Sequence, residues 1–118
     1  MSNATQASGE NSVPGMPAGV TGERIALADR EARGFVIPLG PVDLVLAVTA
    51  SGMLCCGAFD VAALDRFSYP AVKAKASAGG SIATVADLLV AEVTVTNAAA
   101  AARGITVGMS GRDALELL

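Results

Sequence analysis

The chain has 118 residues and a formal net charge of -3; 53% of its residues are apolar but only 3% are aromatic. This length indicates a single domain that can bury a core, which Val, Leu, Ile and Ala must build because aromatic residues are so few. A negative net charge argues against a nucleic-acid partner, which would require a basic face. Membrane insertion is not expected, because the best apolar run, Val42 to Ala50, contains Asp43 and is far shorter than the ~20 residues of a spanning helix.

Histidine is absent from the sequence. Its absence excludes His-based acid–base catalysis, the usual Ser-His and Cys-His nucleophile pairs, and zinc sites that use imidazole. Cys55 and Cys56 are adjacent, so they cannot supply a four-thiolate metal site and would form only a strained ring if oxidised. We therefore expect no metal and no cofactor. The free thiols and the lack of a secretion signal predict a reducing, cytoplasmic location.

Residues 1–19 are rich in Ser, Asn, Gly and Pro, and Glu10 is the only charged residue among them. Such a composition cannot bury enough apolar surface to offset the entropy of ordering, so we expect a disordered tail. Residues 20–118 are then expected to form one domain.

The first half of that domain has the composition of strands separated by short polar or glycine-containing turns. Turns this short favour antiparallel hairpins. The expected strands are residues 23–28, 32–39, 42–49 and 53–56.

After Gly57 the pattern favours helices, and each of them has a polar residue suited to an N-cap. The first expected helix is opened by Asp60 and ends near Phe67, and a possible strand follows at 71–76. A second helix is expected from Thr84 through Val90, and then an alanine-rich helix that is capped by Thr96 or Asn97 and ends at Arg103. The last expected helix runs from Arg112 to Leu118 and is capped by Ser110. The predicted fold is thus α+β, with N-terminal antiparallel β-strands followed by a helix-rich C-terminal half.

Three segments carry a resemblance to a known family: residues 56–61 (CGAFDV), 84–89 (TVADLL) and 104–115 (GITVGMSGRDAL). Together they are similar to the YunC-like family, a bacterial and archaeal domain of unknown function. The resemblance extends from about Val20 to Leu118. It implies a small α+β domain whose N-terminal β region mediates formation of a homo-tetramer, and it implies no established activity.

Cys56 is the first candidate site residue. Its thiol precedes a glycine turn and a helix N-terminus, whose dipole could stabilise a thiolate. Alternatively, Cys56 is a small buried apolar residue that packs under that helix, as most free cysteines do. We favour the buried role, because the sequence has no histidine to act as a base and no lysine adjacent to Cys56.

Asp60 is the second candidate, as an acid, a base or a cation ligand beside Cys56. A structural role explains its position fully, because an N-cap carboxylate accepts hydrogen bonds from exposed N–H groups of the first helical turn. We favour the capping role.

The third candidate is the loop that contains Gly108, Ser110, Gly111 and Arg112. Free N–H groups, a helix dipole and a forked guanidinium could together bind an anion. Alternatively, the glycines only provide turns while Ser110 caps the helix, which is the interpretation we favour. The segment Gly79-Gly80-Ser81 resembles a phosphate loop, and we expect only a turn there.

Two functions remain open. The first is a homo-oligomeric, non-catalytic module that binds a small anionic ligand or a protein partner. The second is an enzyme that uses Cys56 as a nucleophile with Asp60 and Arg112 nearby. The composition favours the first, because the usual base for a thiol is missing.

Overall fold

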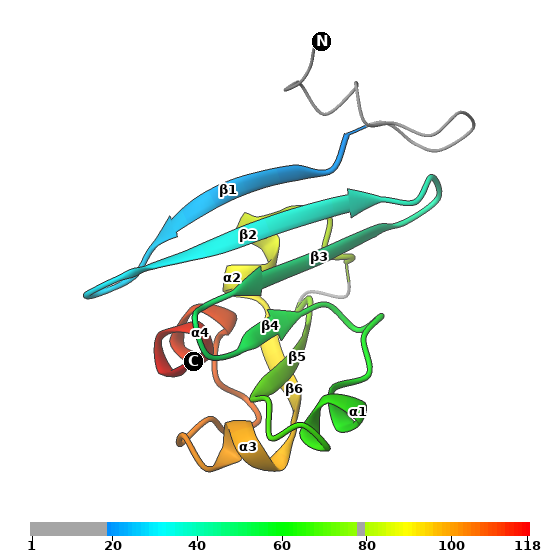
Figure 1. Ribbon diagram of the computed structural model, residues 1–118. Helices are drawn as coiled ribbons and strands as arrows, with labels where there is room; N and C mark the ends of the chain where they lie inside the picture. Colours follow the sequence, from blue (N-terminus) through cyan, green and yellow to red (C-terminus); the bar gives the residue numbers. More distant parts are fainter. Residues whose placement is uncertain (1–18, 78–79) are drawn as a thin grey trace, which may run out of the picture.

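The computed structural model describes residues 19–77 and 80–118, so the predicted tail, apart from Gly19, lies outside the described residues. Within these residues six strands form one sheet in the order β1-β2-β3-β4-β5-β6 (Figure 1). The strands are β1 (Thr21–Ala26), β2 (Glu31–Pro38), β3 (Asp43–Val48), β4 (Met53–Cys55), β5 (Ala71–Lys75) and β6 (Glu92–Thr96). The helices are α1 (Val61–Asp65), α2 (Val85–Val90), α3 (Ala98–Ala101) and α4 (Gly111–Leu117).

Strands β1 to β4 pair as consecutive antiparallel neighbours, which confirms the hairpins predicted for this half. Their turns are short: the Leu39 N–H donates to the Val42 oxygen at 2.9 Å and the Thr49 N–H donates to the Gly52 oxygen at 2.9 Å. Gly40 has a φ of +113°, a conformation that only glycine adopts without strain, so a glycine is required at this turn.

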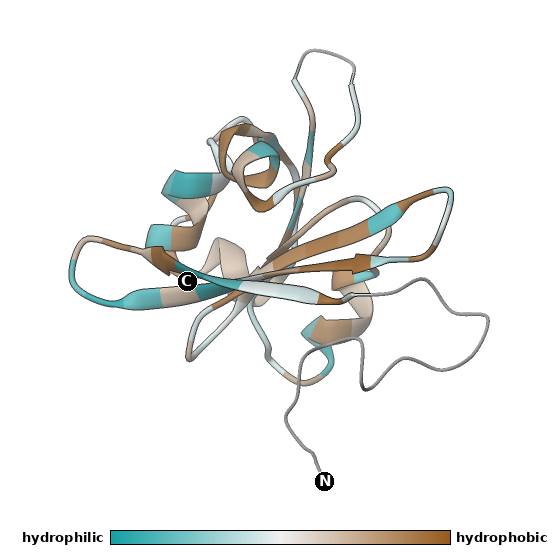
Figure 2. Cartoon of the chain, turned by 90° about the horizontal axis from the view of Figure 1, so that it is seen from above, coloured by the Kyte–Doolittle hydropathy of each residue, from teal (hydrophilic) through white to brown (hydrophobic). Residues whose placement is uncertain are grey.

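The two faces of the sheet are covered unequally. Helices α2 and α4 lie on one face, where they close the main core (Figure 2). Helix α1 lies on the other face and packs over β4 and β5, leaving much of β2 and β3 beside it uncovered. The largest fully buried side chains of the main core are Val45, Leu54, Val72, Leu88, Val93, Ile105, Leu115 and Leu118.

The prediction of a helix-rich C-terminal half is wrong. Residues 92–96 form β6, which pairs antiparallel with β5 and completes the sheet. This segment reads Glu-Val-Thr-Val-Thr, an alternating and β-branched pattern typical of a strand. The alanine-rich helix is also shorter than predicted: α3 ends at Ala101, and turns continue to Gly104, whose φ is +88°.

The predicted N-caps are confirmed where the structure describes them. The Asp60 carboxylate accepts from the Ala63 N–H at 3.1 Å, and the Ser110 hydroxyl accepts from the Asp113 N–H at 3.1 Å. Thr84 makes the expected capping box with the residue three positions on, and Asn97, not the alternative Thr96, caps α3. Each of these helices therefore begins within one residue of where the sequence predicted.

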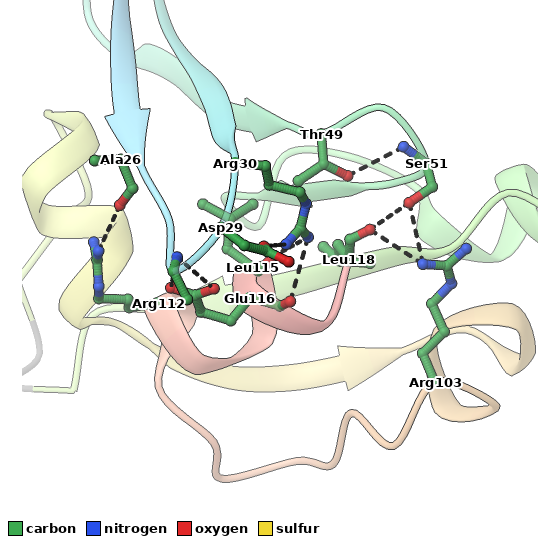
Figure 3. Close-up of polar contacts among 11 residues, drawn as sticks. Ala26, Asp29, Arg30, Thr49, Ser51, Arg103, Arg112, Leu115, Glu116 and Leu118 are labelled. Atoms are coloured by element: carbon green, nitrogen blue, oxygen red, sulfur yellow. Dashed lines mark hydrogen bonds and ion pairs between the residues drawn. The ribbon is translucent and has the colours of Figure 1, made fainter.

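Polar contacts hold α4 against the turn between β1 and β2 (Figure 3). The Ala28 N–H donates to both carboxylate oxygens of Glu116, at 3.1 Å each, and the Arg30 guanidinium donates to the Leu115 oxygen at 3.4 Å. The Arg112 guanidinium donates to the Ala26 oxygen at 2.6 Å. These bonds fix the helix to the N-terminal strands across more than 80 residues of sequence.

Within residues 19–77 and 80–118, no helix has the length and apolar character needed to cross a membrane.

Asn97 is the buried polar residue that joins three elements on the α1 side of the fold. Its side-chain oxygen accepts from the Ala71 N–H at 3.1 Å and from the Ala100 N–H at 3.0 Å. Its amide group donates to the Val61 oxygen at 3.0 Å and to the Tyr69 oxygen at 2.8 Å. All four hydrogen bonds are satisfied, so Asn97 connects the start of β5 to α1 and α3.

Asn97→Ala should lower the free energy of unfolding by about 3 kcal/mol, because it leaves several buried main-chain groups without a partner. Asn97→Asp is the matched variant: it keeps the two accepting bonds but places a buried carboxylate oxygen against the Val61 and Tyr69 oxygens, so its loss should be at least as large. Urea denaturation followed by circular dichroism measures both. A loss below about 1 kcal/mol for the alanine variant would show that the four bonds are not needed.

Candidate functional site

A pocket of about 310 Å³ opens at the carboxyl ends of β4 and β5, and we name it the β4–β5 pocket. These two strands are the parallel pair of the sheet, joined by the crossover that contains α1. The carboxyl ends of adjacent parallel strands are a common place for ligands in α/β sheets. The pocket is lined by Cys56, Gly57, Lys73, Ala74, Lys75, Ala76, Gly80, Ser81, Ile82, Thr94 and Val95.

Cys56 is buried, with 8% of its surface exposed, and it is one of the residues that line the pocket. Its N–H donates to the Val45 oxygen at 3.0 Å, which anchors the chain directly after β4. The expectation that Cys56 packs under α1 is wrong, because Cys55 has that position, in contact with the cluster around Val61. Successive side chains of a strand point to opposite faces, so only one of the two thiols can face α1.

Cys55 is a fully buried thiol whose Sγ donates to the Val72 oxygen at 3.4 Å. Burial first, and then the neighbouring Cys56, raises its pKa from an ordinary 9.0 to about 12, although Lys73 acts in the opposite direction. Because a thiolate is the reactive form of cysteine, Cys55 is not a nucleophile at neutral pH.

Lys73 and Lys75 both line the β4–β5 pocket, and they are the only lysines in the sequence. Lys73 is half-buried and pairs in register with Cys55, whereas Lys75 is exposed and lies opposite Glu92 on β6. The ion pairs of the described residues, Arg24–Glu31 and Arg30–Asp29, involve neither lysine.

Sequence reasoning placed both lysines in water and overlooked their proximity to Cys56. The signal that could have revealed it is the order strand, helix, strand between residues 53 and 75. Such a crossover makes two strands parallel and brings their carboxyl ends together.

Asp60 and Arg112, the predicted partners of Cys56 in an enzyme, do not line the pocket. Asp60 is exposed and caps α1, and Arg112 donates to a main-chain oxygen of β1. In this structure Asp60 therefore caps α1, and Arg112 connects α4 to β1 by a hydrogen bond.

The loop at residues 108–112 uses its N–H groups within the fold. The Gly108 N–H donates to the Val93 oxygen at 2.9 Å, and the Gly111 N–H donates to the Ala91 oxygen at 2.8 Å. Gly108 has a φ of +98°, and a side chain at Gly111 would collide with the main-chain oxygen of Leu88. The N–H groups of Gly108 and Gly111 are therefore already occupied by main-chain oxygens of the fold.

The segment Gly79-Gly80-Ser81 is described only in part, because Gly79 lies outside the described residues. Gly80 and Ser81 belong to the wall of the β4–β5 pocket. In the described part of the chain, no three Cys, Asp or Glu side chains converge as a metal site would require.

The fold and this site define a small α+β domain with a mixed sheet and a pocket at its parallel strands. Residues 55–118, more than half of the chain, match the family described as Domain of unknown function (DUF1805), and the chain belongs to this family, which is the YunC-like family. No curated protein matches the chain.

Among solved structures, the chain is similar to a protein of unknown function from Thermoplasma acidophilum, TA1206. The TM-score is 0.73 at 21% sequence identity, over 82% of this chain and 90% of that one. At this identity the likeness concerns the fold alone.

Gly111→Ala should destabilise the protein by about 3 kcal/mol or more, because the added methyl group meets main-chain atoms of α2 that cannot move aside cheaply. Gly57→Ala is the matched control, since nothing lies within 4 Å of a methyl group there. Thermal unfolding compares the two variants. Equal stability of both would contradict the close approach of α4 to α2.

The buried thiol of Cys55 should make stability depend on pH above 9. Its folded pKa is raised, so the stabilisation is complete below the ordinary value of 9.0 and is lost as the pH rises toward 12. Above pH 9 the loss is about 1.4 kcal/mol for each pH unit, because only the unfolded chain releases the proton.

Urea denaturation of the wild type and of Cys55→Ala at pH 8, 9.5 and 10.5 tests this expectation. The stability advantage of the wild type should shrink at that rate and then reverse. Other titrating groups, such as Tyr69, are common to both proteins and cancel in the difference. Parallel pH profiles would show that Cys55 ionises in the folded protein.

Proposed function

We propose that this protein is a cytoplasmic, homo-oligomeric and non-catalytic module, assembled through its N-terminal strands, that binds a small anionic ligand or a protein partner. The observation that carries the proposal is an apolar surface on β2 and β3 that is only partly covered. We name it the β2–β3 patch and define it by Phe35, Ile37, Leu44 and Leu46.

The β2–β3 patch lies on the face of the sheet opposite to α2 and α4. The register pairs Phe35 with Leu46 and Ile37 with Leu44, so the four side chains adjoin one another on one face. All four are half-buried, and Leu46 packs against the cluster around Val61. Contiguous apolar area of this kind is typical of a surface that contacts another protein.

The shape of the sheet supports the same interpretation. Strands β1, β2 and β3 extend beyond the helices as a projecting three-stranded part of the sheet (Figure 1). Hydrophobic residues colour much of the hairpin between β2 and β3 (Figure 2). At its turn Val42 is 58% exposed and Leu39 is 43% exposed. The simplest way to bury the apolar surface of these three strands is to pack it against the same surface of another copy of the chain.

A homo-tetramer is the assembly that the family resemblance implies. In the described residues no strand pairs with the outer edge of β1, which offers a second contact surface besides the β2–β3 patch. Two different contacts suffice to build four subunits. The free thiols of Cys55 and Cys56 suit a reducing compartment.

An enzyme that uses Cys56 as its nucleophile is the second candidate, and the lysines in the same pocket favour it. In this alternative Lys73 replaces Asp60 and Arg112 as the charged neighbour of the thiol. Alkylation rates of native protein against pH distinguish the two functions, and Cys55 is too deeply buried to interfere. An apparent pKa below about 7 would favour the enzyme, because a free thiol has a pKa of about 8.5.

Leu44→Glu should convert the oligomer to monomers, because a carboxylate cannot be buried in an apolar interface without a large desolvation cost. Ile37→Glu, at the cross-strand neighbour, should have the same effect. Val107→Glu is the control, since Val107 is 62% exposed and lies outside the patch. Light scattering behind a sizing column at micromolar concentration gives the mass, and circular dichroism checks that each variant is folded.

A wild type that elutes as a monomer at micromolar concentration would contradict the proposal. So would a folded Leu44→Glu variant that keeps the mass of the wild-type oligomer.

A further inference from the structure

We infer that the β4–β5 pocket binds a small carboxylate with an aliphatic body, such as a short-chain fatty acid. This inference rests on the binding role proposed above and names its site and its ligand class. It is carried by the composition of the pocket wall, which gathers both lysines of the chain beside an otherwise largely apolar surface.

The positive charge of the pocket comes from a single strand. Lys73 and Lys75 are two residues apart on β5, so both side chains leave the same face of the sheet. None of the six arginines of the chain lines the pocket. A chain with a net negative charge thus has both of its lysines in the wall of one hollow.

The charge available there suits a ligand with one negative charge. Lys75 pairs in register with Glu92, which also lines the neighbouring hollow together with Lys75. This carboxylate offsets part of the positive charge at the outer lysine. Lys73, half-buried and nearer to Cys56 in the register, then leaves about one net positive charge for the ligand.

The rest of the wall favours an aliphatic body. The wall includes the apolar residues Ala74, Ala76, Ile82 and Val95, and Cys56 adds a further weakly polar residue. Pockets for small molecules commonly have such walls with a few polar groups that set the orientation. A volume of about 310 Å³ is at the small end of that class.

Phosphate suits the pocket less well. Proteins usually hold phosphate with free N–H groups at a helix start or with a forked arginine. The lining residues include no arginine and no residue of a helix. A carboxylate needs only one or two ammonium donors, which Lys73 and Lys75 supply.

The test uses the two lysines as reporters. Reductive methylation with ¹³C-formaldehyde keeps their charge and gives each an NMR signal, separate from that of the N-terminal amine. Full-length protein is titrated with hexanoate, with hexanamide as the neutral analogue, and with inorganic phosphate. We expect saturable shifts of both lysine signals with hexanoate, and at least tenfold weaker binding of hexanamide and phosphate.

Matched variants assign the site. Lys73→Met keeps the apolar stem and removes the charge, so it should weaken hexanoate binding on the order of tenfold or more, as loss of a charge-assisted hydrogen bond does. Lys73→Arg should restore most of the affinity. Arg66→Gln, which removes a cation that does not line the pocket, should bind hexanoate like the wild type. Calorimetry measures these variants without any label.

Protection of Cys56 gives a second, independent readout. Hexanoate should slow the alkylation of this thiol by the fraction of sites it occupies, whereas hexanamide at the same concentration should not. Unshifted lysine signals, or equal binding of hexanoate and hexanamide, would overturn the inference. Phosphate that binds as tightly as hexanoate would overturn the choice of a carboxylate.

Light scattering of the same samples separates this inference from the proposed assembly. An oligomer that does not bind hexanoate overturns the ligand and leaves the assembly in place. A monomer that binds hexanoate supports the ligand and overturns the assembly.

Discussion

The parallel pairing of β4 and β5 is the constraint on which the rest of the structure depends. Leu54 buries its side chain under α4, while Cys55 on the opposite face packs against the α1 cluster. A three-residue strand thus supports both layers. Because the pairing is parallel, the chain must cross over between the two strands, and α1 forms that crossover. Asn97 holds the crossover in place by donating to the Val61 and Tyr69 oxygens.

The same pairing creates the β4–β5 pocket. Cys56 follows β4 directly, and Lys73 lies in β5 beside the end of β4, so residues 17 apart in sequence line one hollow. The desolvation that makes Cys55 inert arises from the packing on its own side of the strand. Two adjacent cysteines therefore have different surroundings, because a strand alternates its side chains.

Local patterns in the sequence predicted the N-terminal hairpins and the helix starts. Caps such as Asp60 and Thr84 depend on neighbours within three residues, and a single sequence contains those neighbours. Strand β6 also had a local signal, because Glu92 to Thr96 alternates. The interpretation of this half as helical overlooked that signal.

The site could be predicted only in part, because its residues meet through tertiary pairing. Cys56 was a candidate from its position before a glycine and a helix, and the structure adds the pocket around it. Lys73 and Lys75 read as the solvent side of a strand, since nothing near them in sequence indicates β4 as their neighbour. Conversely, the glycine loop at residues 108–112 looks like a ligand loop in sequence. In the structure, the Gly108 N–H donates to Val93 of β6, and the Gly111 N–H donates to Ala91, the residue that follows α2.

The two edge strands of the sheet differ, and this difference limits how the sheets of two copies of the chain can pair. The outer side of β6 is occupied at its start: Val93 exchanges main-chain hydrogen bonds with Gly108 and Met109, and a bridge joins Glu92 to Ser110. In the described part of the chain, β1 has no strand on its outer side. When the β1 edges of two copies pair with each other, neither copy has a free β1 edge left. Growth by pairing of β1 with β1 therefore stops at two copies.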